Sequence, residues 1–245
     1  MRPPRLVPQA ASIGIASATD SILRSTPERL HELLTGRGAR FAWFCVAAVC
    51  GGAGLYGAVM GSWCAALQAL YVAIKLPLLL LLTTLGNALL NAMLAPLLGL
   101  DMSLRQSLTA VLMSFAVAAL ILGALSPVAL FVVWNTPPLD AATSLSSPEY
   151  AFLQLTHAAF IAFAGTVGNL RLEPVLRQWT DRPAVARKVL FAWLAGNLFL
   201  GSQICWVMRP FIWDPARPVV FIGREYFHGS FYETVFEAAR RLLFP

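Results

Sequence analysis

The feature that most constrains this chain is an apolar run over residues 65–100, in which Lys75 is the only charged residue. The same character extends over the whole chain, because 58% of its 245 residues are hydrophobic and only 12% are charged. Soluble domains average about 25% charged residues, since their surface must face water. The composition therefore excludes a soluble enzyme, a disordered chain and a disulfide-rich secreted domain, and it predicts an integral membrane protein.

The length of this run determines how it should cross a membrane. As one helix it would reach about 54 Å, although a hydrocarbon core of about 30 Å needs only about 20 residues. Pro77 is a natural break point because it lacks a backbone N–H. We therefore expect an interfacial stretch over 63–74 and a crossing over 76–98 that leaves Lys75 at the membrane edge, where its ammonium can reach water. A crossing at 66–86 with Lys75 buried is the alternative, and a central Lys costs about 2.5–3.5 kcal/mol on insertion scales.

Four further apolar runs bring the expected number of crossings to five. The expected spans are 41–60, 76–98, 108–134, 150–167 and 189–208. Together they predict an all-α, polytopic transmembrane helix bundle over residues 41–208. A cytoplasmic N-terminal tail over 1–40 precedes the bundle, and an aromatic-rich C-terminal tail over 209–245 follows it. The spacings Gly57-x-x-x-Gly61 and Ala192-x-x-x-Gly196 favour close helix packing.

Basic residues are distributed unevenly among the segments between spans. The tail 1–40 holds six arginines and the loop 169–188 holds five basic residues, whereas the loop 135–149 holds none. Because loops rich in Arg and Lys stay inside, we expect the N-terminus in the cytoplasm and the C-terminus outside. Sixteen of the 18 basic residues are Arg and the spans are rich in Ala, which favours a bacterial source and hence the bacterial inner (plasma) membrane. The net charge of +6 is expected to interact with the anionic lipids of the bilayer and not with nucleic acid.

Both tails carry patterns typical of surface helices. Thr26-Pro27-Glu28 predicts the start of a short amphipathic helix. Ser230 followed by Glu233 predicts a capping box that opens an interfacial helix over 230–243. Nine of the 37 residues in the C-terminal tail are aromatic, so this tail is expected either to pack on the protein's own spans or to dock a partner. The candidate partner or membrane-interface residues are Trp213, Phe227, Phe231, Phe236, Arg240 and Arg241.

Polar residues inside the spans are the candidate site residues, because polar groups in hydrocarbon are costly. Asn87 and Asn91 are four residues apart and so share one helix face. The complete candidate set is Asn87, Asn91, His157, Asn197 and Gln203. These side chains either line a polar route through the bundle or bind a lipid headgroup, or they form hydrogen bonds between helices that contribute about 0.6–2 kcal/mol each. No Asp or Glu lies inside an expected span, which argues against a pump or an ion-coupled transporter.

The sequence contains no G-x-S-x-G, H-E-x-x-H, Walker or C-x-x-C motif. His31, His157 and His228 are expected in different compartments, so they do not predict a shared metal site. We therefore expect no enzyme activity, no catalytic residue, no cofactor and no metal. The cysteines are interpreted as small apolar side chains, and Cys64 with Cys205 is the only pair considered for a disulfide.

Part of the chain resembles bacterial Yip-domain membrane proteins. The resemblance lies in Lys75-Leu-Pro-Leu-Leu-Leu-Leu-Leu-Thr-Thr84, in Leu98-Gly-Leu-Asp-Met-Ser-Leu-Arg-Gln106 and in the span that follows. In that family an apolar helix ends at Leu-Gly, a short polar loop follows and another helix returns. The resemblance covers roughly residues 41–208 and implies five spans, a cytoplasmic N-terminus and a role as a membrane-organising or trafficking adaptor.

The sequence leaves two functions open. The first is a non-catalytic subunit, scaffold or adaptor of a membrane complex, which holds a membrane-protein partner or a second copy of itself through the N-terminal helix, the loop 169–188 or the aromatic tail. The alternative is a lipid or small-molecule permease component that uses the intramembrane Asn and Gln residues. The absence of catalytic motifs and the two unusual tails favour the first.

Overall fold

The expected all-α class is confirmed. The computed structural model describes residues 38–97, 99, 102–137, 148–180, 182–209, 211–212 and 218–233. Within these ranges the long helices are α3 (Gly38–Gly61), α4 (Ala66–Leu97), α5 (Leu104–Asn135), α6 (Pro148–Leu170) and α8 (Pro183–Met208). In this part of the chain five helices are long and apolar enough to cross a membrane, as expected of a multi-pass membrane protein.

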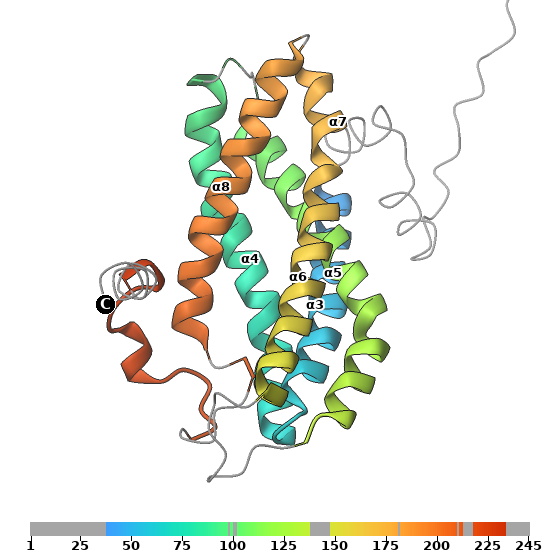
Figure 1. Cartoon of the computed structure of the whole chain (residues 1–245). Helices are drawn as coiled ribbons and strands as arrows, with labels where there is room; N and C mark the ends of the chain where they lie inside the picture. Colours follow the sequence, from blue (N-terminus) through green and yellow to red (C-terminus); the bar gives the residue numbers. More distant parts are fainter. Residues whose placement is uncertain are drawn as a thin grey trace, which may run out of the picture.

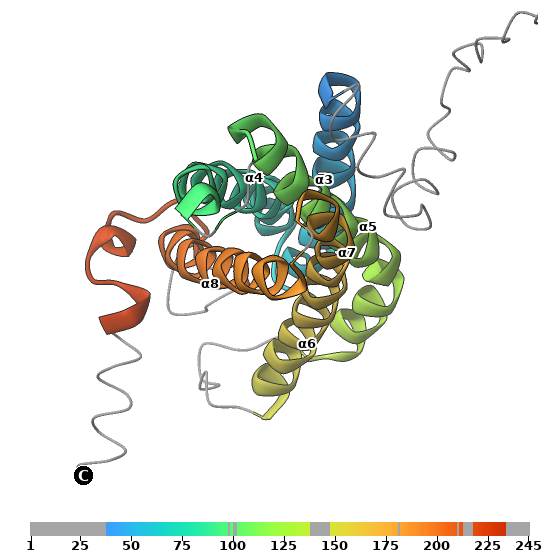
Figure 2. The ribbon, with the colours of Figure 1, turned by 90° about the horizontal axis from the view of Figure 1, so that it is seen from above.

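The long helices run up and down the bundle in sequence order (Figure 1). Seen from above, α5 lies between α3 and α6, and α8 lies beside α4 (Figure 2). Helix α5 packs against α3, α4 and α6, whereas α8 packs mainly on α4. Short or small side chains dominate the buried face of α5, so its neighbours can approach closely. These residues are Ser107, Ala110, Ser114, Ala116, Ala118, Ala119, Ser126 and Ala129.

Helix α4 contradicts the expected break, because it continues without interruption through Pro77. Neighbouring helices can compensate for a proline inside a membrane helix, and here α3 supports α4. Gly57 of α3 leaves no room for a side chain because it lies against the backbone of Val72. Lys75 is consequently not at a helix end but fully buried within α4. The candidate span Ala66–Asn91 is closer to the alternative crossing at 66–86 than to the expected one.

Two other helices also differ from the expectation. Helix α8 begins at Pro183 instead of residue 189, because proline at the first turn suits a helix start. The loop 169–188 is also more ordered than expected, since it contains α7 (Leu172–Leu176) and the 3-10 helix η1 (Arg177–Trp179). Leu172, Val175 and Leu176 are completely buried, so α7 covers the end of the bundle instead of forming a free basic loop.

Cys64 and Cys205, the pair considered for a disulfide, are both free in the structure, as are the other two cysteines. Cys64 lies between α3 and α4, where burial raises the pKa of its thiol above the usual value. A thiol with a raised pKa stays protonated and reacts poorly. The cysteines of the bundle are therefore reduced side chains in this structure.

The predicted capping box at Ser230 is confirmed. The backbone N–H of Glu233 donates to Ser230 Oγ at 3.1 Å, and the backbone N–H of Ser230 donates to Glu233 Oε2 at 3.0 Å. Only the first turn, 231–233, of the helix expected over 230–243 lies among the described residues. The helix expected at Thr26 lies outside them. So do four tail candidates: Trp213, Phe236, Arg240 and Arg241.

Candidate functional site: a buried amide cluster beside a lateral groove

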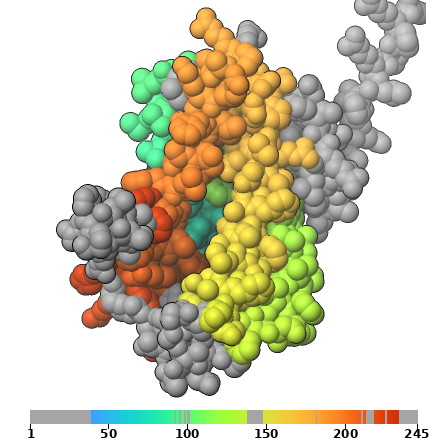
Figure 3. All heavy atoms as spheres, in the orientation of Figure 1, coloured from blue at the N-terminus to red at the C-terminus, as the bar shows by residue number. Residues whose placement is uncertain are grey.

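Helices α6 and α8 stand apart on one side of the bundle. The space-filling view shows the surface hollowed between them, with atoms of α4 and α5 visible at the bottom (Figure 3). Among the spanning helices, α6 packs mainly on α5 and α8 packs mainly on α4. A groove therefore opens sideways between α6 and α8, toward the region that the lipid chains would occupy.

Asn87 connects α4, which is visible at the bottom of the groove, to α8, which forms one of its sides. Its Nδ2 donates to Asn197 Oδ1 at 2.7 Å and to the carbonyl oxygen of Trp193 at 3.2 Å. Gly196 permits this approach, because a Cβ atom there would collide with Asn87 Oδ1. Asn87 and Trp193 are completely buried, and Asn197 is 9% exposed. The structure thus brings together two of the five candidate residues, Asn87 and Asn197, across one helix interface.

Asn91 lies one turn farther along the same face of α4 and is also completely buried. Neither its Nδ2 nor its Oδ1 has a hydrogen-bond partner in the structure. The Nδ2 of Asn197 and the indole Nε1 of Trp193 are unpaired as well. An unpaired buried donor or acceptor costs about 1–3 kcal/mol, and more in hydrocarbon. The cluster Asn87, Asn91, Trp193 and Asn197, here called the amide cluster, therefore has donors and acceptors left for another molecule.

His157 belongs to a different interface. Its Nδ1 is 2.7 Å from the hydroxyl oxygen of Tyr56 on α3, and the two rings meet edge to face with centroids 5.5 Å apart. Both side chains are buried, so this contact connects α3 to α6 inside the bundle. Sequence reasoning did not single out Tyr56. The signal that could have identified Tyr56 is its hydroxyl, a polar group within the apolar span 41–60 that needs a hydrogen-bond partner.

Gln203 does not join the amide cluster either, because it contacts the C-terminal segment. The backbone N–H of Phe231 donates to Gln203 Oε1 at 3.3 Å. Beside it, the hydroxyl of Tyr232 donates to the carbonyl oxygen of Phe199 at 2.6 Å and lies 2.6 Å from Ser202 Oγ. The rings of Phe199 and Tyr232 stack with centroids 4.9 Å apart. The described end of the aromatic tail therefore packs on the protein's own helix α8.

Phe227 and Phe231 are the two candidate partner or membrane-interface residues that lie among the described residues. Phe227 is 65% exposed and Phe231 is 37% exposed, although Phe231 also meets the ring of Tyr232 edge to face. These two rings are available to lipid or to a partner. In the described ranges, no group of three or more His, Cys, Asp and Glu side chains could hold a metal ion.

No family model, curated protein or solved structure matches this chain. The resemblance to Yip-domain proteins therefore stays a prediction.

Proposed function

We propose that this chain binds a neutral amphiphile, meaning a lipid or a lipid-like small molecule, as part of a lipid or small-molecule permease. The amide cluster would hold the polar group of the ligand, and the groove between α6 and α8 would hold its apolar part. The main support for this proposal is Asn91, because both polar atoms of its buried side-chain amide lack a hydrogen-bond partner. A bound ligand would supply the hydrogen bonds that no side chain of the described residues gives to Asn91.

The chemistry of the cluster indicates the class of ligand. Asn87, Asn91, Trp193 and Asn197 are all uncharged, and together they offer both donors and acceptors. A neutral group that also donates and accepts, such as a hydroxyl, an amide or a sugar, matches them. Hydrogen bonds are stronger in a low-dielectric interior than in water, so a few such bonds would select the ligand.

The subunit, scaffold or adaptor role is the competing proposal. It draws on the aromatic tail as a docking surface, and part of the described segment 218–233 is already used within the chain. Tyr226 is 1% exposed, and Tyr232 is bonded to α8. Among the described residues, the exposed rings of Phe227 and Phe231 are what this role would use, with a membrane-protein partner or a second copy of the chain.

We also propose that the N-terminus lies in the cytoplasm and the C-terminus outside, in a bacterial inner membrane. The charge distribution supports this orientation. The end of the bundle where α3 begins, α5 begins and α8 begins carries most of the described basic residues: Arg40, Arg105, Arg171, Arg177, Arg182, Arg187 and Lys188. An odd number of crossings then puts the C-terminus on the opposite side.

The test is purification from native membranes in a mild detergent, followed by native mass spectrometry of the wild type and of Asn91→Leu. We expect the wild type to carry one specific neutral lipid and Asn91→Leu to lose it. Asn135→Leu is the matched control, because Asn135 is exposed and bonds only to its own helix. If Asn91→Leu keeps the lipid, the amide cluster does not bind it. If the wild type carries a stoichiometric protein and no lipid, the subunit role replaces this proposal.

A further inference from the structure

Lys75 is a second polar group inside the bundle, and the proposed neutral ligand does not reach it. Its side chain is 0% exposed, and its Nζ has no hydrogen-bond partner. Lys75 precedes Asn87 by twelve residues of the same helix, which is about 18 Å along the helix axis. Ionisable residues within spanning helices are rare and usually pair with another group. The unpaired Nζ therefore needs an explanation of its own.

Lys75 lies well inside the apolar part of α4. The candidate span runs from Ala66 to Asn91, so Lys75 is nine residues, or about 14 Å, from its nearer end. The large apolar side chains that precede Lys75 are exposed on the surface that lipid chains would cover: Leu67, Leu70 and Ile74. Lipid phosphates lie outside the hydrocarbon core and do not reach this depth. A ligand of Lys75 must therefore be able to enter hydrocarbon.

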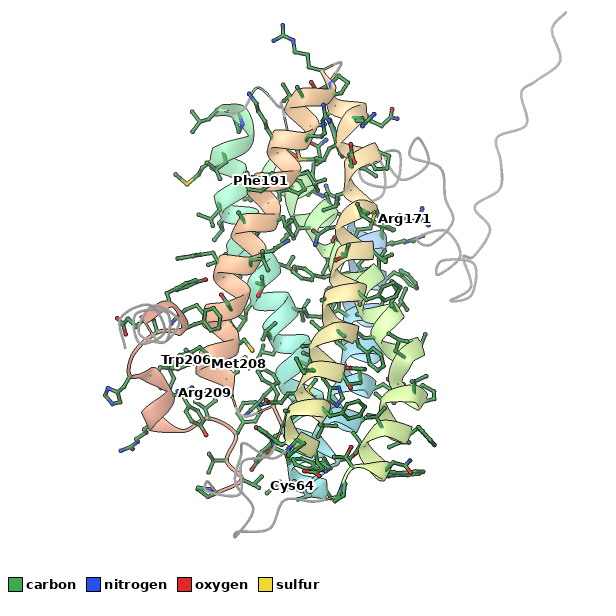
Figure 4. All side chains as sticks on the ribbon, viewed as in Figure 1. Cys64, Arg171, Phe191, Trp206, Met208 and Arg209 are labelled. Carbon is green, nitrogen blue, oxygen red and sulfur yellow. The ribbon has the colours of Figure 1, made fainter. Side chains whose placement is uncertain are left out.

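The cover over Lys75 comes from the C-terminal segment and not from a spanning helix. Because α4 and α8 run in opposite directions and Asn87 pairs with Asn197, α8 ends at about the depth of Lys75. Figure 4 shows Met208, the last residue of α8, at the lower end of that helix. There the ring centroid of Phe221, which is half-buried, lies 5.5 Å from Nζ. A ring on a connecting segment can move without displacing a spanning helix, so a small group can reach Nζ beneath it.

The spanning helices offer no carboxylate to Lys75. Helices α3, α4, α5 and α8 contain no Asp or Glu, and the acidic residue of α6, Glu149, lies in its first turn. Glu173 pairs with Arg177 at the opposite end of the bundle. Glu233 completes a capping box. Since the spanning helices of a second copy lack the same group, the partner of Lys75 is a different kind of molecule.

An apolar face of α4 continues from Lys75 along the helix. Leu78, Leu82 and Leu85 follow it by three, seven and ten residues, so they lie on the same side of the helix. They are 37%, 42% and 54% exposed. From Lys75 to Leu85 this face covers about 15 Å, which is half of a hydrocarbon core of about 30 Å and hence the depth of one acyl chain. With its carboxyl group at Lys75, an acyl chain can lie along these leucines and remain in the lipid.

We propose that Lys75 binds the carboxyl group of a long-chain fatty acid beneath Phe221. A lone charge is costly in an apolar interior, but a protonated carboxylic acid is neutral and can reach this depth. Its proton then passes from the carboxyl oxygen to the Nζ amine. The O–H bond breaks, an N–H bond forms, and a carboxylate–ammonium pair remains. Hydrogen bonds between charged groups are stronger than neutral ones, so Lys75 would select an acid over an ester of the same chain length.

A carboxylate on a spanning helix of a partner protein is the competing source. Such a helix would have to displace the segment 218–227 from the side of α4, whereas a fatty acid only has to pass its carboxyl group beneath Phe221. The structure therefore favours the free acid. This site is separate from the amide cluster and does not depend on it.

The first experiment compares palmitic acid with methyl palmitate, which has no ionisable carboxyl group. Retention of each by delipidated protein is measured by native mass spectrometry. We expect the wild type and Lys188→Met to prefer the acid, and Lys75→Met to lose this preference by about tenfold or more. Lys188 is the matched control, because it is an exposed lysine at the opposite end of the bundle. Equal retention of acid and ester by the wild type, or unchanged preference in Lys75→Met, overturns the proposal.

A spectroscopic measurement on the wild type covers the case in which Lys75→Met does not fold. Palmitic acid labelled with carbon-13 at its carboxyl group reports its own ionisation by NMR. The bound acid should keep its carboxylate signal to a lower pH than the acid dissolved in the same detergent, because a neighbouring ammonium favours the charged form of a carboxyl group. A bound signal that titrates together with that of the dissolved acid overturns the ion pair with Lys75.

Two controls separate this site from the other proposed roles. Asn91→Leu should keep the preference for palmitic acid even where it loses the neutral lipid. Loss of that preference in Asn91→Leu would overturn the separation of Lys75 from the amide cluster. Purification from native membranes tests the competing source of the carboxylate. A stoichiometric protein that is present with the wild type and absent from Lys75→Met would overturn the fatty acid in favour of a partner helix.

Discussion

The two sides of the bundle are held together by different kinds of contact. Helices α3, α4 and α5 meet backbone against backbone, as where Gly52 lies on the backbone of Ala119 and Gly57 on that of Val72. Helix α8 is joined to α4 by side-chain hydrogen bonds, such as those of Asn87. Helix α6 combines both kinds of contact, because its Gly168 lies on the backbone of Ser114 and its His157 pairs with Tyr56. Half of the most apolar window of α3 is buried, compared with 17% for α8.

This difference indicates which part of the molecule can rearrange most easily. Without a hydrophobic driving force between helices in lipid, close packing of small residues and hydrogen bonds hold a bundle together. Backbone packing leaves few alternative arrangements, because a shift would create a collision. A helix that is held mainly by a few hydrogen bonds, as α8 is, can separate at a modest cost. The groove between α6 and α8 therefore lies beside the helix that is easiest to move. The following predictions test this contrast.

The largest loss of stability is expected for Gly52→Leu. A side chain at this position would collide with the backbone of α5 at Ala119, and overpacking of this kind typically costs about 1–3 kcal/mol or more. Thermal unfolding in detergent should show a large drop in the midpoint. Gly51→Leu is the matched control, because Gly51 is exposed and a Cβ there meets nothing within 4 Å. Equal midpoints for the two variants would contradict the backbone-packed core.

A smaller effect is expected for Asn87→Ala, which removes both hydrogen bonds to α8. Interhelical hydrogen bonds in membranes average about 0.6 kcal/mol and reach about 1.7 kcal/mol. Gly196→Ala should also destabilise, since the new methyl displaces the Asn87 amide. In a double-mutant cycle, Gly196→Ala should cost less in the Asn87→Ala background than in the wild type. Strict additivity would show that the two residues do not act through one contact.

Tyr56→Phe is expected to have a similar or slightly smaller effect, because it removes one hydrogen bond and keeps the ring. The loss should be about 1 kcal/mol or less, and it should loosen α6 from α3. The midpoint of thermal unfolding measures the loss. Tyr71→Phe is the control, since the ring contact of Tyr71 with Phe221 does not need the hydroxyl. A drop for Tyr71→Phe as large as that for Tyr56→Phe would count against the Tyr56–His157 bond.

The smallest effect on stability is expected for Asn91→Leu in delipidated protein. Because the amide of Asn91 has no partner in the bundle, replacing it with an apolar group removes no contact and relieves an unpaired donor and acceptor. The midpoint should stay the same or rise, in contrast to Asn87→Ala. A marked drop would show that Asn91 stabilises the bundle directly, and it would weaken the assignment of its amide to a ligand.

Much of the fold could be predicted from the sequence because the bilayer sets the length of its helices. Five apolar runs predicted five helices, and the spacing of Asn87 and Asn91 predicted that they share a face. The continuity of α4 could not be predicted, because Pro77 is a helix breaker in isolation. Only the packing of α3 against α4 near Val72 shows why the break does not occur.

The candidate site was predictable in its residue types but not in its pairings. Asn87, Asn91, His157, Asn197 and Gln203 were equivalent candidates, since each is a polar residue in an apolar span. The structure separates them into three surroundings: the amide cluster, the contact with Tyr56 and the contact with the C-terminal segment. Trp193 and Lys75 gained their importance only from burial without a hydrogen-bond partner.

The sequence by itself determined that this chain forms five apolar helices of membrane-spanning length, roughly where they lie except for the start of α4 and of α8, and which residues break the apolar pattern. These properties are local, because hydropathy and helix periodicity depend on residues close together in the chain. The tertiary structure decided which helices approach backbone to backbone, which amides remain unpaired and where Lys75 lies. Those properties depend on residues from different helices, such as Asn87 and Asn197, which are 110 positions apart, and only the packed bundle brings them into contact.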